Sequence, residues 1–351
     1  MNTLDPGKPN DNPAGDGNSL AELGLSVITD AITGVSIPEP IKQNAFKAFG
    51  RLCSAVVEVP AAYLEGVVAE KKATTAARVK LIETNAAQIA RQMQVDPEYA
   101  RIAVRKFGQK ILREQVNLDL VSEEAARQLR DAEYSQSEPQ ISEIEDDWLN
   151  HFEKEASQRS SEDMQKLFGR ILAGEIRRPS SFSIKALKIM GEIDRGAATL
   201  FKNLCSACIV LQVPKVGQII DARIPSLGGN AASNALQKYG FSFGQLNILQ
   251  EHGLIISDYN SYMGYEMCIA DKELRVALGF SYQNSNWGLV PIEDRPPNAP
   301  FRVHGVALSQ AGRELLKIVE IEPIDHYTND LRSFFEKEKL RMTPMSDSPK
   351  T

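Results

Sequence analysis

Residues 148–193 read WLNHFEKEASQRSSEDMQKLFGRILAGEIRRPSSFSIKALKIMGEI, and this stretch decides the fold. Ser160 and Asp163 have the spacing of a helix capping box. Pro179 predicts the end of that helix, because the residue before a proline avoids the α region. Between these two signals, large apolar residues recur at steps of three and four, which places them on one helix face: Met164, Leu167, Phe168, Ile171, Leu172 and Ile176.

Two further helices are expected directly after this one. Ser181 or Ser183 can cap the second, because a serine oxygen accepts a hydrogen bond from a free N–H of the first turn. Asp194 is placed to cap the third. The apolar positions of the two helices are Ile184, Leu187, Met190 and Ile193, followed by Leu200, Phe201, Leu204, Cys205 and Cys208. Three amphipathic helices with short links predict a compact helical core.

The same residues carry a resemblance. The run from Trp148 through Gln165, with Leu172-Ala173-Gly174-Glu175 and Pro179-Ser180-Ser181-Phe182-Ser183, resembles a bacterial family known only as a domain of unknown function, DUF2806. The likeness covers about residues 140–255. More distantly the chain is similar to the alpha-type abortive-infection proteins of phage defence. The resemblance implies a helical fold and an association with defence, and it brings no catalytic residues.

Length and charge limit the function classes. A chain of 351 residues can hold two or three domains. Its formal net charge of −6 argues against a protein that coats nucleic acid or anionic membrane with its whole surface. Locally, residues 69–115 hold ten bases against five acids, and residues 119–163 hold fourteen acids against four bases. Such blocks usually form solvated faces or pack against each other, and less often form a docking surface.

The N-terminal third is expected to be helical. Residues 1–18 predict a disordered tail, polar and without the basic-then-apolar pattern of a signal peptide. No run of eighteen uncharged apolar residues follows, so a cytoplasmic protein is expected. Leu20–Ile32 and Ile41–Ala69 have apolar faces that favour packing against other helices, with peripheral membrane contact through residues 19–69 as the alternative.

Helix signals continue after residue 69. A helix is expected over Glu70–Met93, and Asp96-Pro97 predicts the start of another that ends near Glu114. Ser122 is expected to cap a separate helix.

In the C-terminal third of the sequence, strand signals appear between the helix signals. A helix from Ser242 to His252, strands at Leu254–Ser257 and Tyr265–Ala270, and a helix from Ser309 give the layout of a winged-helix module. Further strands are expected at Trp287–Ile292 and Arg302–Leu308, and a last helix at Asp325–Leu340. The insertion at residues 271–300 is long for such a module. The helix SFGQLNILQEH lacks Lys and Arg, which argues against DNA because phosphate neutralisation dominates such binding.

Few residues suggest chemistry. Cys205-x-x-Cys208 has zinc-ligand or redox spacing, but both cysteines lie on an apolar stripe and core packing is favoured. His151 lies four residues from Asp147 and from Glu155, which favours an exposed charged face over a metal site. Gly228-Gly229-Asn230 favours a plain turn over an anion site.

The remaining candidates are three arginines. Arg170, Arg177 and Arg178 approach the C-terminus of one helix, where the helix dipole favours cations. Contact with an anion or a partner is the sharper hypothesis for them. No catalytic, cofactor-binding or metal residue is predicted, and no cofactor is expected.

The sequence therefore predicts a mainly α protein with a helical N-terminal region, a central helical bundle and a C-terminal α+β module that resembles a winged helix. The expected domains are residues 19–140, 141–211 and 212–341, between disordered tails at 1–18 and 342–351. A non-enzymatic interaction or sensor protein with a protein partner is the leading hypothesis, in phage defence if the resemblance holds. A DNA-binding regulator acting through the C-terminal module is the alternative, and an enzyme with an unrecognised site is the third.

Overall fold

The computed structural model describes residues 37–53, 96–134, 142–213, 217–230, 232–296 and 299–345. Tertiary contacts divide the chain into two compact units. The first unit comprises Met1–Ile144 with Ala156–Arg177, and the second comprises Glu145–Glu155 with Arg178–Thr351. Each unit contains buried apolar side chains.

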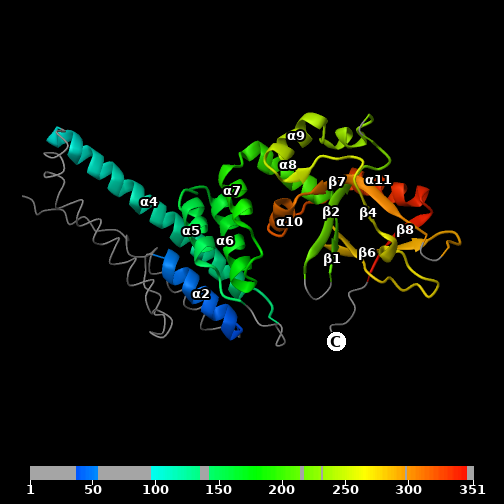
Figure 1. The fold of residues 1–351 in the computed structure, drawn as a ribbon, viewed down its shortest axis with the longest axis horizontal. Helices are drawn as coiled ribbons and strands as arrows, with labels where there is room; N and C mark the ends of the chain where they lie inside the picture. The colour runs from blue at the N-terminus through cyan, green and yellow to red at the C-terminus, as the bar shows by residue number, and fades with distance from the viewer. Residues whose placement is uncertain are drawn as a thin grey trace, which may run out of the picture. The chain divides into compact units, whose positions relative to one another are not determined.

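The first unit is built on three helices, α2 (Glu39–Leu52), α4 (Pro97–Arg130) and α6 (Glu162–Arg177). All three pack against one another (Figure 1). Asn44 of α2 links the unit internally, because its side chain donates to the Ile176 carbonyl (3.3 Å) and accepts from the Ile144 amide (3.1 Å). The core between the helices is apolar and includes Ile41, Ala45, Phe49, Leu52, Leu118, Val121, Ala125, Leu129, Phe168, Ile171, Leu172 and Ile176.

Local signals explain where these helices begin and end. Asp96 caps α4 by accepting from the amides of Glu98 (2.8 Å) and Tyr99 (3.1 Å), and Pro97 occupies the first turn, as predicted. α6 ends at Arg177, two residues before Pro179. The predicted break near Ser122 is wrong. α4 continues through that residue because the apolar positions of the helix recur without interruption on both sides of it.

The second unit carries the remaining helices. These are α5 (Asp146–Ala156, of which residue 156 falls in the first unit), α7 (Ile184–Glu192), α8 (Arg195–Ala207), α9 (Phe243–Glu251), α10 (Gln310–Leu316) and α11 (Asp325–Lys337), with short 3-10 helices η2 (Ala235–Tyr239) and η3 (Glu266–Cys268). Side-chain caps at Ser183, Asp194, Ser242 and Ser309 start α7, α8, α9 and α10. The predicted cap at Asp194 is confirmed, Ser183 is the cap of the two serines proposed for α7, and the helix starts predicted at Ser242 and Ser309 are confirmed.

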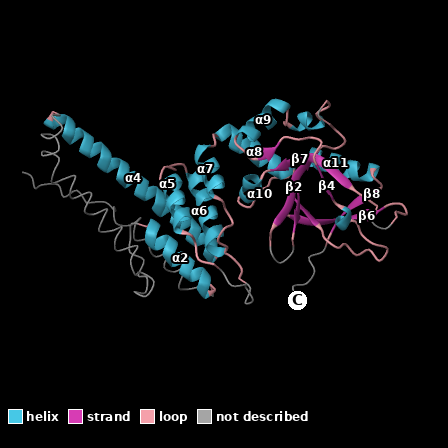
Figure 2. Ribbon diagram, viewed as in Figure 1, coloured by secondary structure: helices cyan, strands magenta, loops and turns pink. Residues whose placement is uncertain are grey.

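An antiparallel sheet forms the centre of the second unit (Figure 2). Its described strands follow the order β3-β7-β2-β1-β5-β6-β8, and β4 also pairs with β7. The strands are β1 (Ile209–Gln212), β2 (Ile219–Pro225), β3 (Ile255–Ile256), β4 (Tyr262–Gly264), β5 (Phe280–Tyr282), β6 (Ser285–Pro291), β7 (Arg302–Leu308) and β8 (Leu340–Pro344). β7 is the hub of the sheet, because β2 pairs with one of its edges while β3 and β4 share the other.

This sheet corrects the predicted fold class. The chain is a mixed α+β protein, because the described residues of its C-terminal part form an eight-stranded antiparallel sheet. The expected winged-helix layout is wrong for the same reason: the strands after α9 join a sheet that also contains β1, β2, β5, β6 and β8. The strand expected at Tyr265–Ala270 contains η3 instead. Residues 342–344, expected within the C-terminal tail, belong to β8.

Predictions for the N-terminal third are tested only in part. The described portion of Ile41–Ala69 lies in α2 as far as Leu52, and its apolar face is buried against α4 and α6. Helix packing, the favoured outcome, is confirmed for this portion. The segments 1–18, Leu20–Ile32 and Glu70–Met93 lie outside the described residues.

Candidate ligand-binding pocket

A cavity of the second unit lies beside the end of β6 and has a volume of about 1030 Å³. Two chain segments line it, one running from η3 to Ala277 and the other from the end of β6 to Ala299. A parallel bridge between Ile269 and Leu289 holds the two segments together, with the Ala270 amide donating to the Leu289 carbonyl (2.8 Å). The volume is at the upper end of the range typical of small-molecule and cofactor sites.

One wall of the pocket is a tight loop organised by Asp271. Its carboxylate accepts from the amides of Glu273 (2.8 Å) and Arg275 (2.9 Å) and pairs with the Arg275 guanidinium (3.1 Å). Hydrogen bonds from these groups, that of the Arg275 amide first, hold the pKa of Asp271 below its usual value. The loop is thus fixed by its own backbone before any ligand binds.

Leu274 is the exposed apolar residue of this loop. Its backbone lies in the left-handed region, with φ at +59°, and its side chain is 70% exposed. A non-glycine residue in that conformation costs on the order of 1–3 kcal/mol, and such residues are common in binding loops. Met267 adds a second exposed apolar side chain to the lining. The pocket therefore offers apolar contact area on a rigid loop.

The opposite wall is held by Arg295. Its guanidinium donates to the Pro300 carbonyl (3.0 Å) and lies 5.8 Å from the centre of the Phe301 ring. Glu266, from the first lining segment, accepts from the Phe301 amide (3.1 Å). Both charged groups therefore fix the segment that leads into β7.

The chemistry of the lining suits binding. Among the described residues that line the pocket there is no Ser, Thr, Cys, His or Tyr, so the usual nucleophiles and the commonest general base are missing from it. Its polar residues are carboxylates and cations, most of which already pair with neighbouring protein groups. In the part of the chain that the structure describes, no three His, Cys, Asp or Glu residues are grouped to hold a metal ion.

The three predicted arginines are not brought into this pocket. Arg170 is half-buried in α6, and the Arg177 guanidinium lies 5.7 Å from the centre of the Tyr134 ring, both in the first unit. Arg178 is exposed in the second unit, beside Gly217, where an added Cβ would lie 2.6 Å from its Nη1. Their role in anion or partner contact stays a prediction.

The predicted cysteine positions agree with the structure. Cys205 and Cys208 are each 2% exposed, and burial raises the pKa of both thiols. Packing of both side chains into the core is confirmed. Whether the pair holds zinc is a matter for metal analysis of the purified protein.

The structure also places the remaining two candidate sites, His151 and the Gly228-Gly229-Asn230 segment. His151 is half-buried in α5, with Asp147 exposed and Glu155 half-buried on the same helix. Gly228-Gly229 forms the predicted turn, closed by the Gly229 amide donating to the Ser226 carbonyl (2.8 Å). Asn230 continues it by accepting from the Ser233 amide (3.0 Å).

The pocket itself is not predicted by the sequence. Residues 271–300 stand out there only as a long insertion, although they contain the signal of a binding loop: Asp271 with Arg275 four residues later, around an apolar Leu274. The second lining segment is rich in charge and proline, and nothing in its sequence indicates which segment it faces.

Comparison with known proteins supplies the family. The model of the family described as "Protein of unknown function (DUF2806)" matches residues 100–332. No curated protein and no solved structure matches the chain. Among the residues that the structure describes, no helix has the length and apolar character needed to cross a bilayer. Because the match covers well over half of its length, the chain belongs to the DUF2806 family of proteins of unknown function.

Proposed function

We propose that this protein is a non-enzymatic interaction or sensor protein that binds a segment of a protein partner in the pocket beside β6. The observation that carries the proposal is the pocket itself, about 1030 Å³ in volume, with Leu274 exposed on a loop that is closed by hydrogen bonds to Asp271. Preorganised apolar residues in a concave site bind with a small loss of conformational entropy. Binding energy at protein interfaces concentrates on such anchors.

The lining favours binding over catalysis. A reaction that uses a Ser, Thr or Cys nucleophile or a His base would need one of these residues in the lining, and the described lining contains none of them. Several of these charges pair with protein groups that shape the walls. Glu273 pairs with Arg275 (3.0 Å), and Glu293 pairs with Lys339 (2.8 Å).

Site-specific photo-crosslinking tests this proposal. A photoreactive amino acid replaces Ala277, an exposed lining residue, in the full-length chain expressed in its native host. The matched control places the same group at Ser333, which is exposed on α11 outside the pocket. A discrete protein adduct at position 277 alone, weakened by Leu274→Ala, is expected. The same adducts from both positions, or none from position 277, would contradict the proposal.

Phage defence is the setting that we propose for this binding activity. The resemblance that the central helical motif of the sequence bears to abortive-infection proteins suggests this setting. The test is phage plating on hosts with and without the intact gene, across a broad phage panel. Reduced plating on hosts that carry the gene, lost with Leu274→Ala, is expected. Equal plating in all hosts removes the defence setting while leaving the binding proposal to the crosslinking experiment.

The DNA-binding alternative gains no support from the described residues. α9, the helix that would enter the major groove, contains neither Lys nor Arg. Mobility-shift titrations at increasing salt test the alternative directly, since DNA affinity falls steeply with salt. A footprint on a promoter at physiological salt would favour the regulator.

A further inference from the structure

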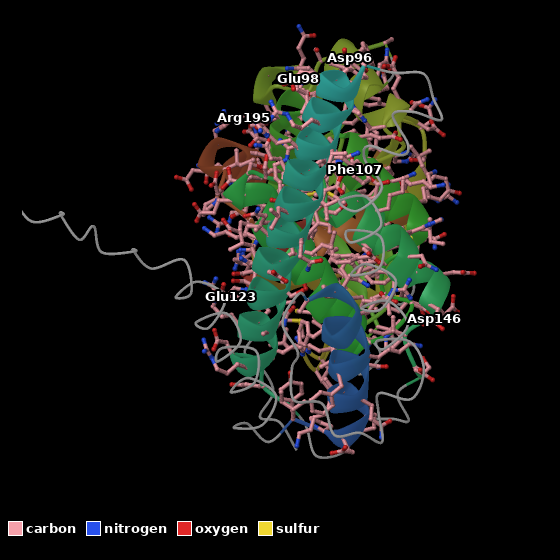
Figure 3. The ribbon with its side chains drawn as sticks, turned by 90° about the vertical axis from the view of Figure 1, so that its left-hand side faces the viewer. Asp96, Glu98, Phe107, Glu123, Asp146 and Arg195 are labelled. Atoms are coloured by element: carbon pink, nitrogen blue, oxygen red, sulfur yellow. The ribbon has the colours of Figure 1, made fainter. Side chains whose placement is uncertain are left out.

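Helix α4 has an outer strip that faces away from the core of the first unit. With 3.6 residues per turn, residues spaced three and four apart form this strip on the side opposite the buried positions. Figure 3 shows Glu98 and Glu123 on one side of α4 and Phe107 on the other. The outer strip consists of Glu98, Arg101, Ile102, Arg105, Gln109, Leu112, Val116, Asp119, Leu120, Glu123 and Arg127.

The strip exposes more apolar surface than a solvated helix face normally does. Leu112 is 68% exposed and Val116 is 52% exposed, at its middle. Ile102 (45%) and Leu120 (40%) lie nearer its two ends. An apolar stripe of this kind on a helix usually faces another element.

The charges of the strip are arranged with opposite signs about Leu112. Toward the N-terminus they run Glu98, Arg101, Arg105, which is negative, positive, positive. Toward the C-terminus they run Asp119, Glu123, Arg127, which is negative, negative, positive. Reversing the strip end for end about Leu112 therefore places Arg105 opposite Asp119 and Arg101 opposite Glu123, in each case a charge of the other sign.

We propose that the outer strip of α4 binds the same strip of a second copy of this chain, antiparallel, with the two-fold axis at Leu112. In such a self-complementary interface each residue pair occurs twice. Leu112 contacts its own symmetry mate, and Val116 lies level with Gly108 of the other copy. The charge pairs join Arg105 to Asp119 and Arg101 to Glu123.

Charge complementarity selects this occupant and this direction. A parallel pair in register would oppose Arg101 to Arg101 and Glu123 to Glu123, and like charges in contact repel. In the antiparallel pair the Arg101–Glu123 contact joins the existing ion pairs within each helix, Arg101–Glu98 (2.7 Å) and Arg127–Glu123 (3.4 Å), into a row of alternating sign. Single exposed ion pairs contribute little, whereas networks contribute more.

The geometry also allows a long contact. From Glu98 to Arg127 the helix rises 1.5 Å per residue, about 44 Å in all. Gly108 leaves room near the centre, because an added Cβ there meets nothing within 4 Å. The Val116 side chain of the other copy falls at this level in the antiparallel register.

A pair of matched variants tests the apolar part. Leu112→Glu places a charge at the two-fold axis, whereas Phe107→Glu makes the same change on the same helix outside the strip, at a side chain that is 48% exposed. Sedimentation velocity of the full-length protein should show a dimer for the wild type and for Phe107→Glu, with at least a tenfold weaker dimer for Leu112→Glu. Circular dichroism confirms that each variant is folded.

A charge exchange tests the register. One chain carries Arg101→Glu with Arg105→Glu, and a second carries Asp119→Lys with Glu123→Lys. Each alone opposes like charges across the axis and should be monomeric, while an equimolar mixture opposes unlike charges at every position and should form a heterodimer. A monomeric wild type, a dimer that survives Leu112→Glu, or a mixture that stays monomeric would each overturn the proposal.

Discussion

At the scale of single residues, the central motif owes its shape to partners far away in the sequence. The Trp148 indole donates to the Phe182 carbonyl (2.7 Å), which ties α5 to the segment before α7. The next residue, Ser183, donates from both its amide and its hydroxyl to the Glu314 carboxylate of α10 (2.7 Å each). The capping role of Ser183 could be predicted from its position. Glu314 could not, because it is 131 residues away.

Removing that carboxylate should destabilise the second unit. Glu314→Ala leaves two partly buried donors of Ser183 without their charged acceptor, which costs about 1.5–3 kcal/mol. Urea unfolding measures the loss. The control is Glu322→Ala, whose carboxylate pairs with Lys202 at the surface and should contribute less than about 1 kcal/mol. Equal effects from both variants would show that the Ser183 contacts are energetically unimportant.

Burial of the cysteine thiols predicts how the stability of the fold depends on pH. Burial raises the pKa of Cys53 and of Cys268 to about 12, from an ordinary value of 9.0. Above pH 9 the unfolded chain releases thiol protons that the folded chain retains, so stability should fall as the pH rises toward 12. Replacing Cys53 and Cys268 by Ala should reduce that fall. An unchanged pH dependence between 9 and 12 in the double variant would contradict the assignment.

At the scale of elements, helices were easier to predict than strands. The apolar spacing and caps of α6, α7 and α8 are local signals that need no knowledge of the rest of the chain. The strands depend on distant partners: β6 pairs with β8, and β2 pairs with β7. Without those partners, the short apolar run of β1 after α8 is not distinguishable from a helix end. The pocket could not be predicted for the same reason, because its two walls are brought together by the pairing of Ile269 with Leu289 of β6.

A buried ion pair within β2 joins this strand to β7 and to the residues that flank β4. Arg223 of β2 binds Asp221 through two hydrogen bonds, of 2.6 and 2.9 Å, and both side chains are nearly inaccessible to solvent. The same guanidinium donates to the carbonyls of Val303 in β7 (3.1 Å) and Ser261 before β4 (3.2 Å). The Tyr265 hydroxyl also donates to Asp221 (3.0 Å). The cluster therefore fixes β4 and β7 against β2.

Breaking the pair on one side should be costly. Asp221→Ala leaves the Arg223 charge buried and uncompensated, which costs about 3–5 kcal/mol. Asp221→Leu with Arg223→Met removes both charges and should recover part of that loss, because a buried ion pair often contributes no more than apolar residues of similar volume. Urea unfolding of both variants decides the matter. A double variant less stable than Asp221→Ala would show that the carbonyl contacts of Arg223 dominate.

At the scale of the whole molecule, the chain passes between the two units three times, after Ile144, Glu155 and Arg177. Each unit nevertheless encloses its own apolar core. The core of the first includes Phe168, and that of the second includes Phe280, both without measurable exposure. Proteins with separate cores often fail to unfold in a single step. The repeated crossing works against separation, because it couples the chain ends of one unit to the other.

Spectroscopy can separate the two cores. Both tryptophans of the chain, Trp148 and Trp287, belong to the second unit, so their fluorescence reports on that unit alone, whereas far-ultraviolet circular dichroism reports on both. Phe168→Ala should cost the first unit about 3–5 kcal/mol by opening a cavity. It should shift the dichroism transition in urea and leave the fluorescence transition in place, while Phe280→Ala should shift both. Coincident transitions that both variants move equally would mean that the crossings make the two units unfold as one.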